Sequence, residues 1–297
     1  MYDIIIIGCG PAGMTAAIYA LRAGKKVLIL EKETIGGQIS SSPLVENYPG
    51  YISISGSELS NNLYDQVINL GGNIELEEVI NIKDSDIKEV ITEDNTYKTK
   101  AVIIATGSKY RLLGLPNEID LIGNGIHFCV ACDGAFYKDK VVAVIGGGNS
   151  AIINALTLSD IFKKVYIVQN LSDLTCEKAL QDKIKSKKNV EIFYDSVVKE
   201  IIGENELESI IIDSNKKLEI NAMFISIGQV PQSEFVKGLV QLNDCKYIVS
   251  NEECTTDKEG IFVAGDCRNK TVRQLTTAIS DGTVAALKAI SYIDNKN

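Results

Sequence analysis

The sequence predicts an α/β protein made of two Rossmann-like dinucleotide-binding domains. Two observations carry this prediction. A glycine-rich turn follows an apolar run near the N-terminus, and the same order of strand, glycine turn and helix begins again near residue 139. Short apolar runs of this kind are typical of parallel strands that are buried on both faces. The chain of 297 residues is long enough for one large or two medium domains.

The first half alternates strands and helices. Residues 2–7 ("YDIIII") predict a buried strand, and residues 14–24 predict a helix that ends at a glycine. A strand at residues 25–31 completes an opening βαβ unit. Four more elements are then expected: a helix over 57–72, strands of a small antiparallel or edge set over 73–82 and 90–98, and a buried strand over 100–108.

The second half repeats this order. Residues 139–162 predict a strand, a glycine turn and a helix, and residues 163–170 predict the next strand. The later segments follow the order of the first half: 189–202, 207–214 and 216–228. Residues 260–293 predict a strand, a loop and a long helix.

The repeat predicts two domains that exchange the chain twice, near residues 114 and 241. One domain would combine residues 1–113 with 241–297, and residues 114–240 would form the central domain. The uncharged run from Ile4 to Leu21 is interrupted by glycines and has no preceding Lys or Arg, so we expect neither a membrane span nor a signal peptide. A net charge of -9 argues against nucleic acid as the main ligand. We therefore expect a cytoplasmic protein.

Two of the seven cysteines, Cys129 and Cys132, form a CxxC motif. The odd number and scattered positions of the cysteines argue against a secreted disulfide framework. A structural zinc site needs four ligands, and His127, the single histidine, would add only a third. We therefore expect no metal and interpret the pair as a redox dithiol.

The first glycine turn has the pattern of a nucleotide site. Gly8, Gly10 and Gly13 form GxGxxG directly after a strand and at the start of a helix. These glycines would allow a tight turn, close approach of the backbone to a pyrophosphate, and close packing of helix on strand. Glu31 closes the second strand, where its carboxylate would accept hydrogen bonds from ribose hydroxyls.

The chain resembles the low-molecular-weight thioredoxin reductases along nearly its whole length. The resemblance rests on these motifs in order: "GCGPAG", "EKETIGGQI", "NYPG", "ATGS", "CVACDGAFY", "GGGNSA", "SIGQVPQ" and "FVAGDCRNKTVRQLTTAISDG". It implies an FAD-binding domain made from both chain ends and a central NAD(P)H-like domain that carries the CxxC. It also implies thioredoxin as the partner and a homodimer.

The resemblance further implies a set of FAD contacts. The pyrophosphate would be held by Gly8, Gly10, Pro11, Ala12 and Gly13, and the adenosine ribose by Glu31. The remaining contacts would lie along the ribityl chain and flavin or close over them: Gly37, Gln38, Asn47, Thr106, Gly107, Gly265, Asp266, Arg273, Gln274 and Leu275.

The resemblance also assigns roles at the dithiol. Cys132 would face the flavin, Cys129 would attack the partner disulfide, and Asp133 would protonate the leaving thiolate. Asp133 could instead cap the turn before Gly134. His127 could lower the pKa of a neighbouring thiol, but we favour the interpretation that it is an exposed residue with no role.

The second glycine turn lacks the residues that NADPH-dependent relatives use. Those relatives have a His-Arg-Arg run after the next strand and another Arg four residues later, whereas this chain has Gln169, Asn170, Leu171 and then Thr175. Ile153 and Asn154 replace the paired glutamates of the family. The chain thus looks most like the ferredoxin-dependent flavin thioredoxin reductases. The alternatives are an NADPH- or NADH-dependent thioredoxin reductase, and a flavin-dependent oxidase of small dithiols.

Overall fold

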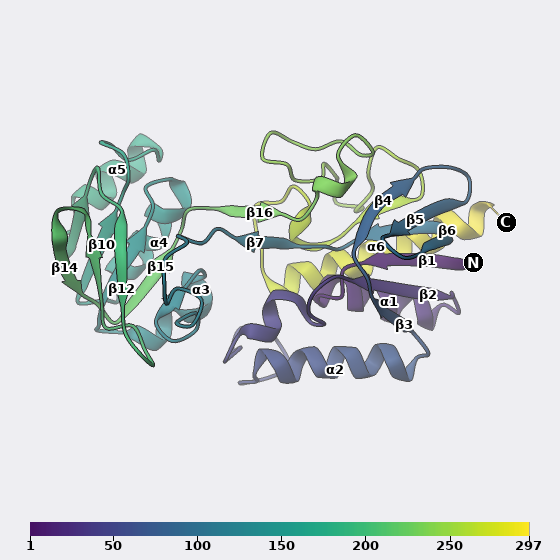
Figure 1. Ribbon diagram of the computed structural model, residues 1–297, viewed down its shortest axis with the longest axis horizontal. Helices are drawn as coiled ribbons and strands as arrows, with labels where there is room; N and C mark the ends of the chain where they lie inside the picture. Colours follow the sequence, from purple (N-terminus) through teal and green to yellow (C-terminus); the bar gives the residue numbers. More distant parts are fainter. Residues whose placement is uncertain (297) are drawn as a thin grey trace. The chain divides into compact units, whose positions relative to one another are not determined.

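The protein is described by a computed structural model that covers residues 1–296 and contains two compact units. Met1–Lys109 and the segment from Val230 onward form the first, here called the N/C unit, and Tyr110–Gln229 form the central unit. Figure 1 shows the purple start and the yellow end of the chain within the N/C unit.

A mainly parallel sheet forms the centre of the N/C unit. Its strands are β1 (Tyr2–Ile7), β2 (Val27–Glu31), β3 (Asn73–Leu76), β4 (Val79–Lys83), β5 (Lys88–Thr92), β6 (Thr96–Ile104) and β17 (Ile261–Val263). Their order is β3-β2-β1-β6-β5-β4, with β17 also paired to β6. β4 and β5 pair antiparallel, as expected for this small set, whereas β3 is a parallel edge strand beside β2.

Helices cover one face of this sheet. They are α1 (Pro11–Arg22), α2 (Gly56–Asn69) and α6 (Leu275–Lys296). The unit also contains the 3-10 helices η1 (Gly37–Ser41), η4 (Glu234–Val236) and η5 (Gly265–Cys267), and Val236 of η4 packs on the opposite face of the sheet. The isoleucines of β1 alternate between the two faces. Ile4 and Ile6 pack into the cluster that contains alanines of α1 and α6, while Ile5 packs into the opposite cluster. This explains why β1 is apolar at every position from residue 4 to residue 7.

The central unit repeats this plan. Its parallel sheet has the order β11-β10-β9-β15-β8, with bounds β8 (Ile126–His127), β9 (Val141–Ile145), β10 (Lys164–Val168), β11 (Val190–Phe193) and β15 (Ala222–Ile225). An antiparallel sheet contains β12 (Val198–Ile202), β13 (Ser209–Ile212) and β14 (Lys216–Glu219). The helices are α3 (Val130–Asp133), α4 (Asn149–Ser159) and α5 (Lys178–Lys185), with η2 (Gly134–Tyr137) and η3 (Asp213–Asn215). The prediction of two Rossmann-like α/β units is confirmed.

The crossings between the units lie in two paired strands, β7 (Ser108–Tyr110) and β16 (Gln229–Pro231). The second crossing therefore comes earlier in the chain than the expected position near 241. Val236 and Val240 explain the difference, because both are buried in the N/C cluster that also contains Ile5. Residues 230–240 thus belong to the N/C unit.

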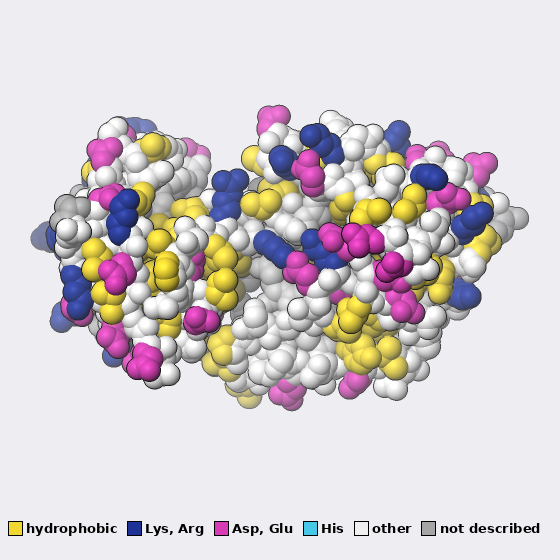
Figure 2. All heavy atoms as spheres, viewed as in Figure 1, with side chains coloured by type: hydrophobic (Ala, Val, Ile, Leu, Met, Phe, Trp, Pro, Cys, Tyr) yellow, Lys and Arg dark blue, Asp and Glu magenta, His cyan; other side chains and the backbone are white. Residues whose placement is uncertain are grey.

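The uncharged N-terminal run forms β1, a turn and α1 rather than one long helix. Within residues 1–296, no helix combines the length and the apolar character needed to cross a membrane. On the face drawn in Figure 2, acidic and basic side chains are interspersed rather than gathered by sign.

Close packing of α1 on α6 depends on small residues. Ala12, Ala16 and Ala285 are buried at this contact. A Cβ atom on Gly282 would lie 2.2 Å from the backbone oxygen of Ala12. The two helices can therefore approach each other only because residue 282 has no side chain.

We predict that Gly282→Ala destabilises the protein by about 1–3 kcal/mol, because the added methyl group overpacks the contact. Glycine in a helix ordinarily costs about 0.5–1 kcal/mol relative to alanine, so helix propensity alone predicts the opposite sign. Urea unfolding followed by circular dichroism measures the change. Ser291→Ala, at an exposed position of the same helix, is the matched control and should leave the stability nearly unchanged. A more stable Gly282→Ala variant would contradict the packing argument.

Candidate functional site: two glycine turns and a dithiol

The first glycine turn is built by backbone contacts that leave no room for side chains. Gly8 has φ +105, and a Cβ there would lie 2.4 Å from the oxygen of Ala105. A Cβ on Gly13 would lie 2.0 Å from the oxygen of Gly8. Gly10 differs, since a Cβ there would have only the Gly37 Cα nearby, at 4.0 Å. The backbone at Gly10 is therefore open to a ligand.

Helix α1 starts at this opening. Pro11 is its first residue and Ala12 is buried, while Gly10 is the N-cap and provides no side-chain cap. The first turn of α1 also contains no acidic residue. The N–H groups of the first turn and the positive end of the helix dipole are therefore available to an anion.

Glu31 is fixed beside the turn. Its Oε2 accepts a hydrogen bond from the Cys9 N–H at 2.7 Å, and its Oε1 accepts one from the Glu33 N–H at 2.9 Å. Each carboxylate oxygen keeps lone pairs that ribose hydroxyls could use. Burial, together with the nearby charge of Glu31, raises the pKa of the Cys9 thiol to about 12, so this thiol remains neutral.

The next predicted contacts lie in three separate loops of the N/C unit. The amide of Gln38 donates to the backbone oxygen of Ser108, which fixes the side chain. Thr106 donates from Oγ1 to the oxygen of Gln232 at 2.6 Å, and Gly107 adopts φ +68 with open space beside it. Asn47 is exposed.

The C-terminal segment brings buried polar atoms without partners to the same unit. Asp266 Oδ1 and Arg273 Nε are buried and have no hydrogen-bond partner within residues 1–296. Burial raises the pKa of the Asp266 carboxyl, although Lys270 and Arg273 oppose this effect. The Arg273 guanidinium lies 4.2 Å from the centre of the Tyr247 ring, which holds it in place. Such atoms are expected where a polar ligand binds, because buried polar groups are otherwise paired.

The remaining C-terminal residues mark the start of α6. Gln274 donates its N–H to Thr277 Oγ1 at 3.1 Å, one residue before the helix begins. Leu275 packs against a small apolar cluster that consists of Val45, Ile54 and Leu59.

A buried ion cluster holds the loop that contains Gly265. Asp281 accepts two hydrogen bonds from Arg268, each at 2.9 Å, and one from Lys270 at 2.8 Å. Its Oδ2 also accepts the Gly265 N–H at 3.1 Å. No pattern in the sequence indicated this cluster, because Asp281 stands among threonine, serine and glycine residues of α6 and its partners come from another segment.

The CxxC pair is a disulfide in the central unit. The Cα atoms of Cys129 and Cys132 are 5.2 Å apart. Cys129 is the N-cap of α3, and its sulfur accepts the Cys132 N–H at 3.2 Å. The five other cysteines are free. A sulfur at a helix N-terminus is stabilised as a thiolate when the bond is reduced.

The surroundings of Asp133 and His127 correct one expectation. His127 is not exposed: it is only 5% accessible and lies on β8. Its Nδ1 is 3.4 Å from Asp133 Oδ2, and its Nε2 is 2.9 Å from the Tyr137 hydroxyl. The side chain of Asp133 makes no capping hydrogen bond to the turn that follows. The structure therefore offers no support for the alternative in which Asp133 caps this turn.

The second glycine turn copies the backbone of the first. Thr175 donates its N–H to the Gly147 oxygen at 2.9 Å, just as Gly36 donates to the Cys9 oxygen at 2.9 Å. Gln169 follows β10 at the place where Glu31 ends β2, and it lies directly against Gly147. A neutral amide thus replaces the carboxylate.

The positions at which NADPH-dependent relatives have charged residues around this turn are apolar or neutral in this chain. Asn170 and Thr175 are exposed, and Leu171 is 48% accessible. Ile153 on α4 is 51% accessible, and the amide of Asn154 bonds to Ser226. The geometry of the turn is retained, but these positions lack the positively charged side chains that would bind a phosphorylated ribose.

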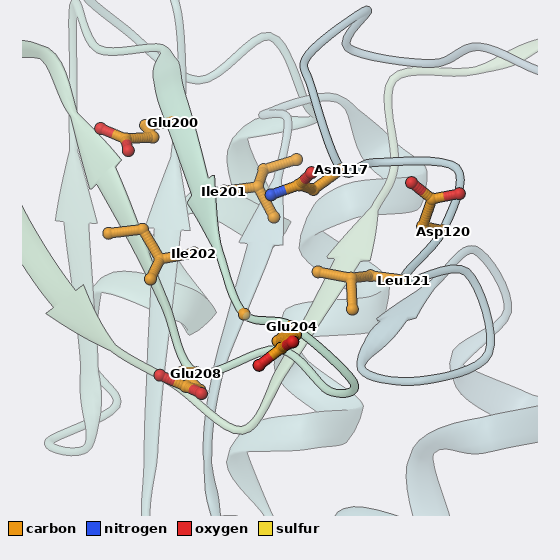
Figure 3. Close-up of a pocket in the computed structure, with 9 residues that line it drawn as sticks. Asn117, Asp120, Leu121, Glu200, Ile201, Ile202, Glu204 and Glu208 are labelled. Carbon is orange, nitrogen blue, oxygen red and sulfur yellow. The ribbon is translucent and has the colours of Figure 1, made fainter.

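An acidic hollow in the central unit lies between residues 117–121 and the edge of β12 (Figure 3). Its carboxylates belong to Asp120, Glu200, Glu204 and Glu208. None of the predicted site residues lines it. Within residues 1–296, no group of three or more His, Cys, Asp or Glu side chains is arranged to hold a metal ion.

Comparisons with known proteins agree with this geometry. The profile of the pyridine nucleotide-disulphide oxidoreductases matches residues 2–282. A "34.2 kDa protein in rubredoxin operon" of Clostridium pasteurianum is 45% identical, covering 99% of this chain and 98% of that protein. Thioredoxin reductase of Bacillus subtilis is 39% identical, covering 99% and 95%. The crystal structure of thioredoxin reductase from Streptococcus pyogenes matches with a TM-score of 0.95 at 39% identity, covering 99% of both chains.

We predict that Asp281→Asn destabilises the protein by about 3 kcal/mol or more, because Arg268 and Lys270 remain buried without a full countercharge. Burial alone would raise the pKa of Asp281, but the hydrogen bonds from Arg268 and Lys270 outweigh burial and lower it. The native-state contribution is therefore complete above the ordinary carboxyl pKa, near 3.9, and is lost as the pH falls through the lowered value.

Urea titrations between pH 3 and pH 7 test this prediction, and the variant should show a weaker loss of stability on acidification. Asp182→Asn, which removes the exposed partner of Lys178, is the control and should change the stability by less than about 1 kcal/mol. Equal effects of the two substitutions would contradict the role given to the cluster.

Proposed function

Because this chain belongs to the pyridine nucleotide-disulphide oxidoreductase family, we propose that it is a thioredoxin reductase that works through Cys129 and Cys132. The observation that carries this proposal is the disulfide at the start of α3, with Asp133 directly after it. A dithiol can transfer two electrons by exchange with a partner disulfide, and the second sulfur resolves the mixed disulfide. The free state of the other five cysteines supports a reducing, cytoplasmic setting.

Thioredoxin reductases of this family are FAD-binding flavoproteins, and the N/C unit fits that cofactor. We assign the pyrophosphate to the open backbone at Gly10 and the start of α1, and the adenosine ribose to Glu31. Asp266 and Arg273 would supply their unpaired buried atoms to the polar chain of the cofactor. Gly8, Gly13, Gly37, Gln38, Asn47, Thr106, Gly107, Gly265, Gln274 and Leu275 complete the proposed set. When bound, FAD supplies a reservoir that gives two electrons and can be filled one electron at a time.

We assign the electron supply to reduced ferredoxin rather than to a pyridine nucleotide. The support is the difference between the two glycine turns. Glu31 offers a carboxylate to a ribose, whereas Gln169 offers a neutral amide whose Nε2 already donates to the Asp173 oxygen. No arginine stands at residues 170, 171 or 175 to pair with a 2′-phosphate. Each lost charge-assisted bond weakens binding by roughly 1.5–3 kcal/mol.

Dependence on NADPH or NADH is the second candidate, and one observation favours it. The second turn keeps the backbone geometry of a nucleotide site, including the bond from Thr175 to Gly147. The resemblance to thioredoxin reductases also leads us to expect a homodimer, which sedimentation of the flavin-loaded chain would test.

We predict different flavin spectra for the two cysteine variants. Cys129→Ser should leave the Cys132 thiolate beside the flavin and produce a long-wavelength charge-transfer band. Cys132→Ser should lack this band, and both variants should lose thioredoxin reduction. Absorption spectra of the purified proteins and thiol counts on thioredoxin measure these outcomes. Cys245→Ser changes an exposed free cysteine and is the control. Identical spectra for the first two variants would refute the assigned roles.

We predict that ferredoxin, and not a pyridine nucleotide, reduces the flavin rapidly. Anaerobic stopped-flow should show flavin bleaching by photoreduced low-potential ferredoxin, followed by reduction of thioredoxin. NADPH and NADH at sub-millimolar concentration should bleach the flavin very slowly. Dithionite is the control, since it shows that the flavin can be reduced in the same preparation. Rapid bleaching by either nucleotide would contradict the ferredoxin assignment and favour dependence on NADPH or NADH.

A further inference from the structure

The only histidine of the chain lies in a restricted place beside the dithiol. His127 pairs in register with Phe224 of the neighbouring strand β15, and the two rings are 5.5 Å apart. Tyr137 packs against the imidazole from η2, with ring centres 5.2 Å apart. The imidazole is therefore held by two aromatic rings, Phe224 in a tilted contact and Tyr137 in an edge contact, and both of its nitrogens lie near polar groups.

The hydrogen bond with Tyr137 determines which nitrogen of His127 carries the proton. Burial, with the charges of Asp133 and Glu206, raises the pKa of the Tyr137 hydroxyl, so the hydroxyl keeps its proton and can donate to His127 Nε2. Nδ1 then carries the proton, and this nitrogen lies 3.4 Å from Asp133 Oδ2. The opposite tautomer would place a lone pair of Nδ1 against an unprotonated oxygen of the carboxyl group, which is unfavourable.

Asp133 is the residue that this chain of contacts orients. Its side chain is 18% accessible and makes no capping bond to η2. Its N–H donates to the Cys129 oxygen at 3.0 Å, so its backbone is tied to the dithiol turn. With Oδ2 facing His127, Oδ1 is the carboxyl oxygen left for another group.

We propose that His127 is a positioning residue that holds the carboxyl group of Asp133 in place for proton transfer, with Tyr137 fixing the imidazole. The proposal rests on the proposed function, since it deepens the role of Asp133 at the dithiol. His127 accepts from Tyr137 and donates to Oδ2, which is an acceptor whether or not the carboxyl is protonated. Oδ1 then carries the proton that a leaving thiolate takes.

The exchange starts from a reduced enzyme with a thiolate at Cys129, a thiol at Cys132 and a proton on Asp133. Cys129 attacks one sulfur of the partner, a new S–S bond forms, and the partner disulfide breaks with its electron pair on the leaving sulfur. That sulfur takes the proton from Asp133. Cys132 then gives its proton to Asp133 and attacks Cys129, which releases the second partner sulfur, and this sulfur takes that proton. The enzyme disulfide and an ionised Asp133 remain, and solvent restores the proton.

Two substitutions distinguish the contacts made by the two nitrogens of His127. In His127→Asn the side-chain amide can take the place of Nδ1 and keep the bond to Asp133. In His127→Gln the amide reaches the place of Nε2 and keeps the contact with Tyr137 but not the bond to Asp133. If His127 only filled space, the larger glutamine would be the better replacement, so the proposal predicts the opposite ranking.

The experiment uses the flavin-loaded protein, reduced with dithiothreitol, freed of reductant under argon and mixed with two disulfide probes. Bis(2-hydroxyethyl) disulfide releases a basic alkyl thiolate, which needs a proton. 5,5′-Dithiobis(2-nitrobenzoate) releases a weakly basic aryl thiolate, which does not. A proton donor therefore matters for the first probe alone. Neither probe requires ferredoxin, thioredoxin or a nucleotide, so the test stands even if the donor or partner assignment fails.

We expect His127→Gln and Asp133→Asn to slow the reaction with the alkyl disulfide at least tenfold, and the reaction with the aryl disulfide less than about threefold. His127→Asn should stay within about threefold of wild type with both probes. Equal rates for His127→Asn and His127→Gln would overturn the proposal, as would equal slowing with both probes. Loss of exchange in every protein, wild type included, would instead refute the dithiol function itself.

A second measurement needs no variant. Because the chain has a single histidine, nitrogen-15 labelling of histidine gives one imidazole in the NMR spectrum of the wild-type protein. The proposal requires a proton on Nδ1 at pH 8. An unprotonated Nδ1 would overturn it even if the variants failed to fold.

Discussion

The structure of the N/C unit depends on backbone contacts that only glycine permits. Gly8 meets Ala105, Gly13 meets Gly8, and Gly282 meets Ala12, each with no space for a Cβ atom. These contacts join three parts of the chain that are far apart in sequence: the first turn, the end of β6 and the last helix. They also set the position of the open backbone at Gly10, since α1 cannot move away from the sheet or from α6. The backbone opening that we assign to the cofactor is therefore a consequence of the packing.

The same plan is used twice in the chain with different charges. In both turns, the backbone oxygen of the residue between the first two glycines accepts a hydrogen bond from a later backbone N–H. Both turns also have a side chain from the end of the second strand beside that residue. In the N/C unit that side chain is Glu31, and in the central unit it is Gln169. A backbone of this shape binds a pyrophosphate through N–H groups and a helix dipole, but a ribose is selected by side chains. The fold could therefore persist in the central unit while its nucleotide specificity changed.

Sequence patterns were sufficient to predict those elements whose burial follows from their own residues. β1 was predicted because isoleucine at every position of a short run fits a strand buried on both faces, and the first glycine turn because its spacing is tied to that strand. The burial of His127 and the ion cluster around Asp281 could not be predicted in this way. Both depend on partners from other elements, Phe224 and Arg268, that only the folded chain brings close. The second domain crossing was misplaced for the same reason, because Val236 becomes part of a core that the local sequence does not reveal.

The C-terminal segment that begins with the Gly265 loop combines a fully paired buried carboxylate with buried polar atoms that have no partner in the described part of the chain. Asp281 has four hydrogen bonds and serves to hold the Gly265 loop. Asp266, in that loop, leaves a buried oxygen unpaired, and Arg273 leaves a buried nitrogen unpaired. Ser60 and Ser209 also have a buried hydroxyl without a partner among the described residues, but Asp266 and Arg273 carry charged groups, for which a missing partner costs more. The cluster at Asp281 thus stabilises, by its own complete pairing, the loop from which we propose that Asp266 contacts the cofactor.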